Sequence, residues 1–366
     1  MTQNYTLYGT DFSLYTGKAR SYLIKKGIPF DEVLSTVSVY KKFIVPRTGV
    51  RYIPVLQTPD DQVYQDTTVI IDQLEDKFPQ PAIYPSTPKQ KLVSLLLETY
   101  GDEWLVIPAM YYRWNYQDVN QPFVFQNFGR VVAPYAPKFI RGWLGKKIAN
   151  RFKSMLPSLG ISEKTSAAIE QSYQQLLADL DTHFSEYEYL LGGRPSIADF
   201  GFIGPLYAHL YRDPFAGKFM QENAPSVCKW VERMNHSKIT TEGFIEGDEI
   251  PDTLVPLIRR MVKEQLPVLL DTDECLVKWH KLNPNTQIPR SIGKHSFKIE
   301  NVTGERVVLP YSLWMFQRSV DFYESLASVE KTQLETFLKD VGLLDALRDG
   351  LNNTLVRTDN RLKFAG

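Results

Sequence analysis

Residues 7–30, LYGTDFSLYTGKARSYLIKKGIPF, decide the fold of the first part of this chain. Residues 5–9, which overlap the start of this stretch, are predicted to form a short strand. From residue 15 to 26 apolar and basic side chains recur on opposite faces at helical spacing, and Gly27 is suited to end that helix. Residues 29–34 then read as a second strand. A strand, a helix and a strand in this order predict a parallel α/β unit.

The next segment completes a compact α/β domain. Residues 54–58 and 62–65 predict two strands joined by a turn at residues 59–61, PDD. A helix with an apolar face begins near residue 66. The order βαβ followed by ββα predicts one domain over residues 1–85.

After residue 85 the hydrophobic period becomes helical. This predicts an all-helical domain over residues 86–250, with a long helix at 90–116 that bends at Pro108. Further helices are expected at residues 162–189, 196–211 and 225–235. Residues 251–366 form an extension that we expect to be mostly helical.

The extension also contains a predicted β-hairpin. A helical segment follows Pro251, and residues 296–309 read as two strands around a turn at Thr303-Gly304. Two helices, at 310–326 and 328–350, are expected to finish the chain.

Composition bounds the function. Lys and Arg total 42, as do Asp and Glu, so the net charge is zero. This argues against nucleic acid as the main partner. The two cysteines, Cys228 and Cys275, form no metal pair, and the five histidines have no metal-ligand spacing. We therefore expect no metal, no membrane span and a cytoplasmic location.

The loop before the first helix is a candidate anion site. A helix N-terminus offers unpaired N–H groups and a partial positive charge, and a hydroxyl at Ser13 adds a donor. Lowering a thiol pKa by two units requires about 2.7 kcal/mol of preferential stabilisation of the thiolate. A helix end and one charge-assisted hydrogen bond supply about that much. The alternative is that Ser13 only caps the helix.

Two further segments have the chemistry to hold a small peptide. If the Ile53–Pro54 bond is cis, the backbone of Ile53 faces outward and can pair with an extended ligand; the alternative is an ordinary trans proline. Asp66 suits a ligand ammonium, and Thr67 with the helix N–H groups suits a carboxylate. The alternative there is a simple N-cap.

Taken together, three stretches resemble the thioredoxin-like N-terminal domain of the glutathione transferase family: LYGTDFSLYTGKAR, YIPVLQTPDDQVY and QDTTVIIDQLEDKFP. Farther along, Ser196 and Asp199 have the spacing of a capping box, in which the Ser196 side chain would accept the Asp199 N–H. This box and residues 224–234 resemble the helical C-terminal domain of the same family. The resemblance covers residues 5–235, and most members of the family lack the extension.

The resemblance implies a set of site residues. Ser13 is the predicted thiol activator, with Tyr8 and Tyr15 as rivals. No cysteine precedes Cys228, which argues against the thiol-exchange branch of the family. The residues implied to bind glutathione are Ile53, Pro54, Asp66 and Thr67.

A second substrate is expected against the helix at residues 103–116. Tyr111, Arg113 and Trp114 would make this wall aromatic with one cationic position, although Arg113 could instead form a salt bridge to a neighbouring helix. The basic run at residues 138–153 could contact a membrane surface or an anionic ligand, or be a solvated helix face.

These features predict a cytosolic glutathione S-transferase with a role in detoxification. Glutathione would be the co-substrate, and its sulfur would attack a small electrophilic molecule. The resemblance also implies a homodimer. The alternative is a protein of the same fold without turnover that binds an apolar ligand or a protein partner.

Overall fold

The computed structural model describes residues 4–236, 238–239, 243–284 and 286–365. The chain divides into two compact units. Unit 1 comprises Met1–Ile83, Pro108–Leu156 and Phe202–Thr241, and unit 2 comprises Tyr84–Ile107, Pro157–Gly201 and Glu242–Gly366. The division into domains at residues 85 and 250 stays a prediction.

Unit 1 contains a four-stranded sheet in the order β2-β1-β3-β4. β1 pairs in parallel with β2, whereas β3 pairs antiparallel with both β1 and β4. This is the thioredoxin-like arrangement that the sequence predicts. The strands are β1 (Tyr5–Gly9), β2 (Phe30–Leu34), β3 (Val55–Gln57) and β4 (Val63–Gln65).

Helices make up the rest of unit 1. They are α1 (Leu14–Lys26), α2 (Val37–Val39), α3 (Val45–Thr48), α4 (Thr67–Lys77), α7 (Gln117–Val132), α8 (Lys138–Lys153), α11 (Pro214–Asn223) and α12 (Pro225–His236), with π-helical segments η1 (Tyr40–Ile44) and η3 (Leu206–Tyr211). Two helices, α6 (Val106–Asn115) and α10 (Ile197–Pro205), begin in unit 2 and end in unit 1.

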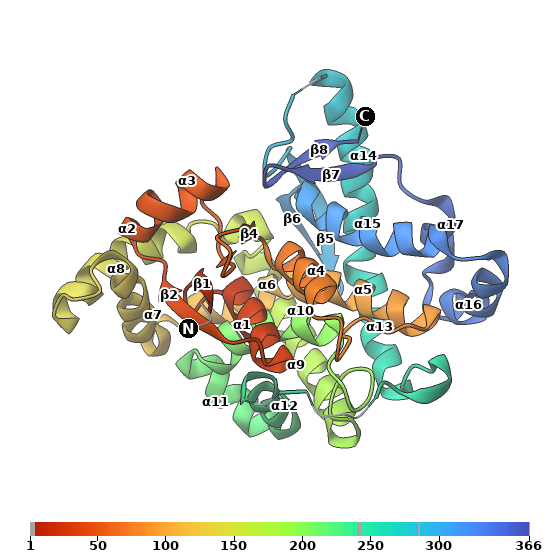
Figure 1. The fold of residues 1–366 in the computed structure, drawn as a ribbon, viewed down its shortest axis with the longest axis horizontal. Helices are drawn as coiled ribbons and strands as arrows, with labels where there is room; N and C mark the ends of the chain where they lie inside the picture. Colours follow the sequence, from red (N-terminus) through yellow and green to blue (C-terminus); the bar gives the residue numbers. More distant parts are fainter. Residues whose placement is uncertain (1–3, 237, 240–242, 285, 366) are drawn as a thin grey trace. The chain divides into compact units, whose positions relative to one another are not determined.

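The first helix has the ends that its sequence predicts. Ser13 is the N-cap, and Gly27 ends α1 in the left-handed conformation with φ 64°, which glycine adopts at little cost. α1 packs against α4 (Figure 1). Between them, the Tyr22 hydroxyl donates to Glu75 Oε1 at 2.7 Å, and Lys26 Nζ lies 2.7 Å from the same oxygen. These contacts fix α1 beside the sheet.

Unit 2 is mostly helical, with two small hairpins. Its helices are α5 (Pro88–Glu103), α9 (Glu163–Glu186), α13 (Val255–Glu264), α14 (Leu266–Leu282), α15 (Pro310–Ser325), α16 (Ser328–Val341) and α17 (Leu344–Asp349), with 3₁₀ segments η4 (Glu246–Asp248) and η5 (Asp252–Leu254); η2 (Leu156–Leu159) joins the units. Its strands are β5 (Lys294–Ile299), β6 (Val302–Val307), β7 (Leu355–Thr358) and β8 (Arg361–Phe364). The predicted fold class is confirmed. No helix in the described part of the chain is long and apolar enough to cross a membrane.

The predicted single helix at residues 90–116 is wrong, because the structure has two helices there. α5 ends at Glu103 and α6 begins at Val106. The break therefore precedes Pro108, which lies in the first turn of α6. A proline in that turn removes an N–H that would have no partner within the helix, so no bend is needed at Pro108 itself.

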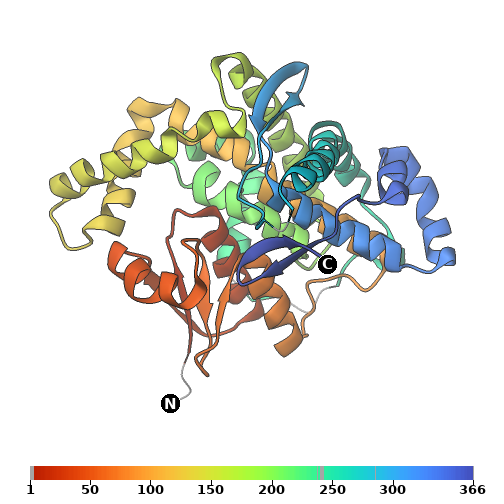
Figure 2. The same ribbon diagram turned by 90° about the horizontal axis from the view of Figure 1, so that it is seen from above.

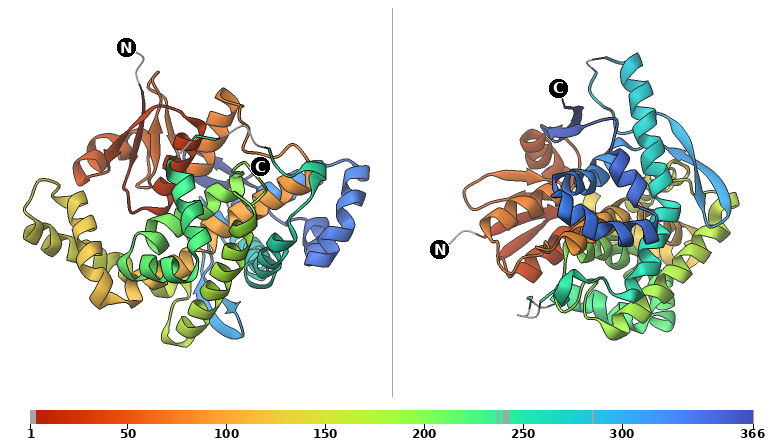
Figure 3. Two further views of the ribbon diagram at one scale, coloured as in Figure 1. Left: turned by 90° about the horizontal axis from the view of Figure 1, so that it is seen from below. Right: turned by 90° about the vertical axis from the view of Figure 1, so that its right-hand side faces the viewer.

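The hairpin in the extension turns earlier than predicted. Ile299 pairs with Val302, so the turn is at residues 300–301 and Gly304 lies within β6. A Cβ on Gly304 would lie 2.6 Å from Phe297 Cε1 and 2.8 Å from Thr165 Cγ2. Gly304 thus allows the hairpin to pack closely on α9 (Figure 3).

The end of the chain departs from prediction in two ways. The predicted helix at 328–350 is divided by Gly342, which has φ 80°. The β7–β8 hairpin was not predicted, although Asp359-Asn360 is a turn signal between two short alternating runs. Both turn residues adopt positive φ, at 51° and 60°. Elsewhere, the helices α7 and α11 were not individually predicted.

His183 is a buried titratable group in unit 2. Its Nδ1 lies 2.8 Å from Thr253 Oγ1, and its ring stacks on Tyr187 with centroids 5.1 Å apart. Burial lowers the pKa of His183 to about 4. The folded protein therefore binds a proton here only in acid.

We expect His183 to destabilise the folded state as the pH falls. In the unfolded chain histidine titrates near pH 6.5, so between about pH 6.5 and 4 only the unfolded state takes the proton. Stability present above pH 6.5 is lost toward pH 4, and His183→Gln should remove about 3 kcal/mol of that loss. Urea unfolding at several pH values measures it, with the exposed His280→Gln as control. Parallel curves for wild type and His183→Gln would contradict the expectation.

Candidate functional site

Three segments far apart in sequence meet at one edge of the sheet in unit 1. β1 ends at Gly9 and leads into the loop that carries Ser13. Since β3 is antiparallel to β1, its first residue, Val55, lies beside the end of β1. β4 ends opposite Val55. The Asp66 N–H then donates to the Pro54 carbonyl at 3.4 Å. Strand order alone therefore brings the predicted activator and the predicted peptide-binding residues together.

Ser13 is a half-buried N-cap at this edge. Its Oγ accepts the Thr16 N–H at 3.3 Å, as the capping alternative requires. In the described part of the chain the Ser13 hydroxyl donates to no acceptor, so its hydrogen can serve a ligand. The loop is shaped by Thr16, because a Cβ on Gly9 would lie 2.2 Å from Thr16 Cγ2.

Two arginines hold the loop at Asp11. Arg212 Nη2 lies 2.9 Å and Arg130 Nη1 lies 3.2 Å from Asp11 Oδ2, and Arg212 also donates to the Asp11 carbonyl. Burial alone would raise the pKa of the Asp11 carboxyl, but the two guanidinium groups outweigh it and hold the pKa below its usual value. Asp11 is therefore ionised at neutral pH.

A third arginine holds the same loop from the interior. Arg113 is buried and pairs with Asp213 through two contacts, Nε to Oδ2 and Nη2 to Oδ1, each 2.6 Å. Arg113 Nη1 also donates to the carbonyl of Phe12 at 3.3 Å, one residue before Ser13. The salt-bridge alternative for Arg113 is thus what the structure shows. Tyr111 and Trp114 are buried as well and offer little surface to a ligand.

The rival activators differ from Ser13 in their surroundings. The Tyr8 hydroxyl donates to Gln57 Oε1 at 2.8 Å, and the Tyr8 ring stacks on Phe43 with centroids 4.2 Å apart. Burial raises the pKa of Tyr8. Its proton is therefore engaged and weakly acidic. Tyr15 lies half-buried in the first turn of α1.

The Ile53–Pro54 peptide bond is cis. Ile53 is half-buried, and among the described residues its backbone N–H and C=O have no hydrogen-bond partner. Beside it, Asp66 Oδ1 accepts the Thr68 N–H at 3.0 Å and caps α4, while Thr67 is buried. An extended peptide could pair with the backbone of Ile53, and the Asp66 carboxylate could attract a cation.

Segment 35–52 forms a helical excursion, α2–η1–α3, next to this edge. Lys41 and Lys42 are exposed in it. Arg47 is also exposed and pairs with Asp61, with Nη1 3.0 Å from Oδ1. These three side chains place positive charge near the site, but no one of them is singled out as a ligand contact.

The Ser196–Asp199 pair in unit 2 differs from the predicted capping box. Both the backbone N–H and the hydroxyl of Ser196 donate to Asp199 Oδ2, at 2.8 and 3.0 Å, and Leu190 N–H donates to Oδ1 at 3.0 Å. Asp199 reaches back as predicted, but the serine hydroxyl donates to the carboxylate. Asp199 thus connects the segment at residues 190–196 to α10.

Sequence reasoning missed the anchors of the Ser13 loop: Asp11, Arg130, Arg212 and Asp213. One signal was present, since Asp213-Pro214 marks the start of a helix. Nothing local indicates that Asp213 meets Arg113, a hundred residues earlier in the chain.

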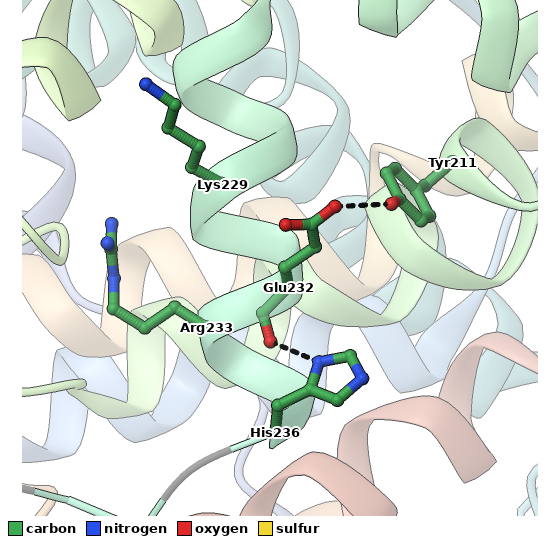
Figure 4. Close-up of a pocket in the computed structure, with 5 residues that line it drawn as sticks. All are labelled: Tyr211, Lys229, Glu232, Arg233 and His236. Atoms are coloured by element: carbon green, nitrogen blue, oxygen red, sulfur yellow. Dashed lines mark hydrogen bonds between the residues drawn. The ribbon is translucent and has the colours of Figure 1, made fainter.

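A surface hollow elsewhere in unit 1 contains charged side chains (Figure 4). Its lining residues are Tyr211, Lys229, Glu232, Arg233 and His236. The Tyr211 hydroxyl donates to Glu232 Oε1 at 2.9 Å, and burial together with this carboxylate raises the pKa of Tyr211 to about 12. None of the predicted site residues lines this hollow. In the described residues, no group of three or more His, Cys, Asp or Glu could hold a metal ion.

The fold and the site define a protein with a thioredoxin-like N-terminal domain and a helical C-terminal domain. Residues 7–82 match the family model for the N-terminal domain of glutathione S-transferase, and residues 149–238 match the model for its C-terminal domain. These two parts of the chain belong to the glutathione S-transferase family. A search of curated proteins gave no match.

The solved structures that this chain resembles share little sequence with it. The β-etherase LigF from Sphingobium sp. strain SYK-6 is 20% identical, with 64% of this chain and 95% of that chain covered and a TM-score of 0.45. A GST-like protein from Pseudomonas syringae is 22% identical, covering 69% and 78%, at 0.43. A Tau class glutathione S-transferase from mango is 17% identical, covering 69% and 95%, also at 0.43. The family assignment rests on the two domain models.

Proposed function

We propose that this protein is a glutathione transferase in which Ser13 activates the thiol of glutathione. One observation carries the proposal: Ser13, with a hydroxyl hydrogen to donate, lies at the N-terminus of α1 on the sheet edge shared by Ile53–Pro54 and Asp66. The Ser13 hydroxyl and the N-terminal end of α1 would stabilise the thiolate.

The same edge suits the rest of the tripeptide. The unpartnered backbone N–H and C=O of Ile53 would form hydrogen bonds with the backbone of the tripeptide. The Asp66 carboxylate would bind its ammonium group, and Thr67 and the N-terminus of α4 would bind its α-carboxylate.

The reaction would be substitution or addition at an electrophilic carbon. The glutathione thiol releases its proton to solvent, and the sulfur forms a bond to the electrophilic carbon. In a substitution the leaving group departs with its bonding electrons. In an addition the double bond or epoxide opens, and the resulting carbanion or alkoxide takes up a proton. This substrate is proposed to lie near the helix that carries Tyr111 and Trp114, whose own side chains are buried and offer it little surface. A homodimer, a cytoplasmic location and a detoxifying role are part of the same proposal.

The test is to titrate the protein with glutathione at neutral pH and follow thiolate absorbance. Halogenated aromatic, epoxide and enone compounds then test turnover. We expect a bound thiol pKa about two units below the free value, which is about 8.5 for a cysteine thiol, and conjugation of at least one compound. Binding with an unshifted thiol pKa would favour a carrier of the same fold, and no binding would favour an interaction role; either result contradicts the proposal.

A further inference from the structure

The α7–α8 hairpin carries a strongly asymmetric charge. Between residues 119 and 162 the chain contains no Asp or Glu but seven Lys and Arg, although the whole chain has 42 of each sign. The basic residues are Arg130, Lys138, Arg141, Lys146, Lys147, Arg151 and Lys153. Because no Asp or Glu in this segment offsets these cations, the segment is a positive region on a protein of zero net charge.

Large aromatic side chains are exposed on the same hairpin. Tyr135, in the loop between the helices, is 99% exposed, and Phe139 and Trp143 on α8 are 78% and 74% exposed. Phe139 and Trp143 are four residues apart, and Lys147 is four residues further on. At 3.6 residues per turn Phe139, Trp143, Lys146 and Lys147 share one face of α8. We call this face, with Tyr135, the aromatic–basic face.

The opposite face of α8 is fixed against α7. A Cβ on Gly145 would lie 1.8 Å from the Phe125 carbonyl oxygen, and one on Gly129 would lie 2.0 Å from the Arg141 carbonyl oxygen. The two helices therefore run antiparallel in direct backbone contact, side by side in Figure 2. Because this inner face is committed, the aromatic–basic face cannot be buried by a simple rotation of α8.

We propose that the aromatic–basic face binds the surface of an anionic phospholipid bilayer. Lys and Arg attract anionic headgroups, while Trp, Tyr and Phe are the side chains that favour the boundary between headgroups and acyl chains. Ile140 and Met155, also exposed, add aliphatic surface that a lipid can bury. The helix lies on the membrane and does not cross it.

Two other partners fit the face less well. A symmetric dimer through this face would bring two sets of cations together without a compensating acid, which is unfavourable. A nucleic acid would satisfy the cations and stack on aromatic rings, but it would leave the aliphatic side chains unused.

The face is connected to the candidate site within unit 1. Phe12, next to Ser13, contacts Phe128 of α7 edge-to-face with ring centroids 5.0 Å apart, and Phe128 contacts Phe152 of α8 at 4.9 Å. These rings connect the Ser13 loop to α8, the helix that would lie on the membrane.

Flotation of the full-length protein with vesicles tests the proposal. We expect binding to vesicles with about one-third phosphatidylserine, weak binding to phosphatidylcholine alone, and loss of binding at high salt. Lys146→Gln with Lys147→Gln should weaken binding about 30-fold. Phe139→Ala with Trp143→Ala should weaken it at least tenfold. Trp143→Phe should abolish a vesicle-induced blue shift of tryptophan fluorescence.

Matched controls separate the face from general charge and apolarity. Lys218→Gln with Lys278→Gln removes two exposed lysines elsewhere, and Leu282→Ala with Val329→Ala removes two exposed apolar side chains. Neither should change binding. Equal binding by the face variants and wild type would overturn the proposal. So would preference for a short DNA duplex, or dimerisation that Phe139→Ala with Trp143→Ala abolishes.

Discussion

Replacing Ser13 with alanine should lower kcat/KM for glutathione conjugation about 10- to 150-fold. The physical reason is the loss of one hydrogen bond to a thiolate, which contributes about 1.5–3 kcal/mol in a charge-assisted contact. The measurement is steady-state kinetics with limiting glutathione, together with the pKa of the bound thiol, which should rise by about one to two units.

The capping role of Ser13 has to be separated from its role toward the thiol. Ser13→Thr keeps both the cap and the hydroxyl donor, whereas Ser13→Asp keeps the cap but replaces the donor with an anion. We expect substantial activity in Ser13→Thr and loss in both Ser13→Asp and Ser13→Ala. If Ser13→Asp is active, Ser13 acts only as a cap.

Tyr8→Phe provides the control for the rival activator. Because the Tyr8 hydroxyl already donates to Gln57, we expect less than a threefold change in kcat/KM. Loss of the thiolate in Tyr8→Phe, with Ser13→Ala unaffected, would transfer the role to Tyr8.

Asp213→Ala should destabilise the protein by about 3–5 kcal/mol. The substitution removes one partner of a buried ion pair that is joined by two hydrogen bonds. It leaves the Arg113 guanidinium without a counter-charge. Urea unfolding measures this free energy. Arg113 also holds the Phe12 carbonyl beside Ser13, so the folded variant should have a lower kcat/KM as well.

A double variant distinguishes the ion pair from simple loss of packing. Arg113→Met with Asp213→Leu replaces both charges by apolar groups, and it should be more stable than Asp213→Ala because no buried charge remains unpaired. Its kcat/KM should stay low, since Phe12 has lost its donor. A loss below about 1 kcal/mol in Asp213→Ala would show that water reaches Arg113.

Local sequence determined the N-terminal α/β part of unit 1. The β1–α1–β2 order, the Ser13 and Gly27 caps and the short strands around residues 59–61 follow from hydrophobic period, capping chemistry and turn residues, all of which act within a few residues. The resemblance then pointed to Ser13, Pro54 and Asp66, and strand order places these three at one edge.

Only the tertiary structure decided what Arg113 and Gly304 do. The sequence left Arg113 as a ligand contact or a salt bridge, and it assigned Gly304 to a turn. In the structure, Arg113 reaches Asp213 and Phe12, and Gly304 admits the ring of Phe297. These outcomes depend on contacts between segments about a hundred residues apart or on the space left between packed elements. Neither the long-range contacts nor the space between packed elements can be read from the periodicity or the composition of any one segment.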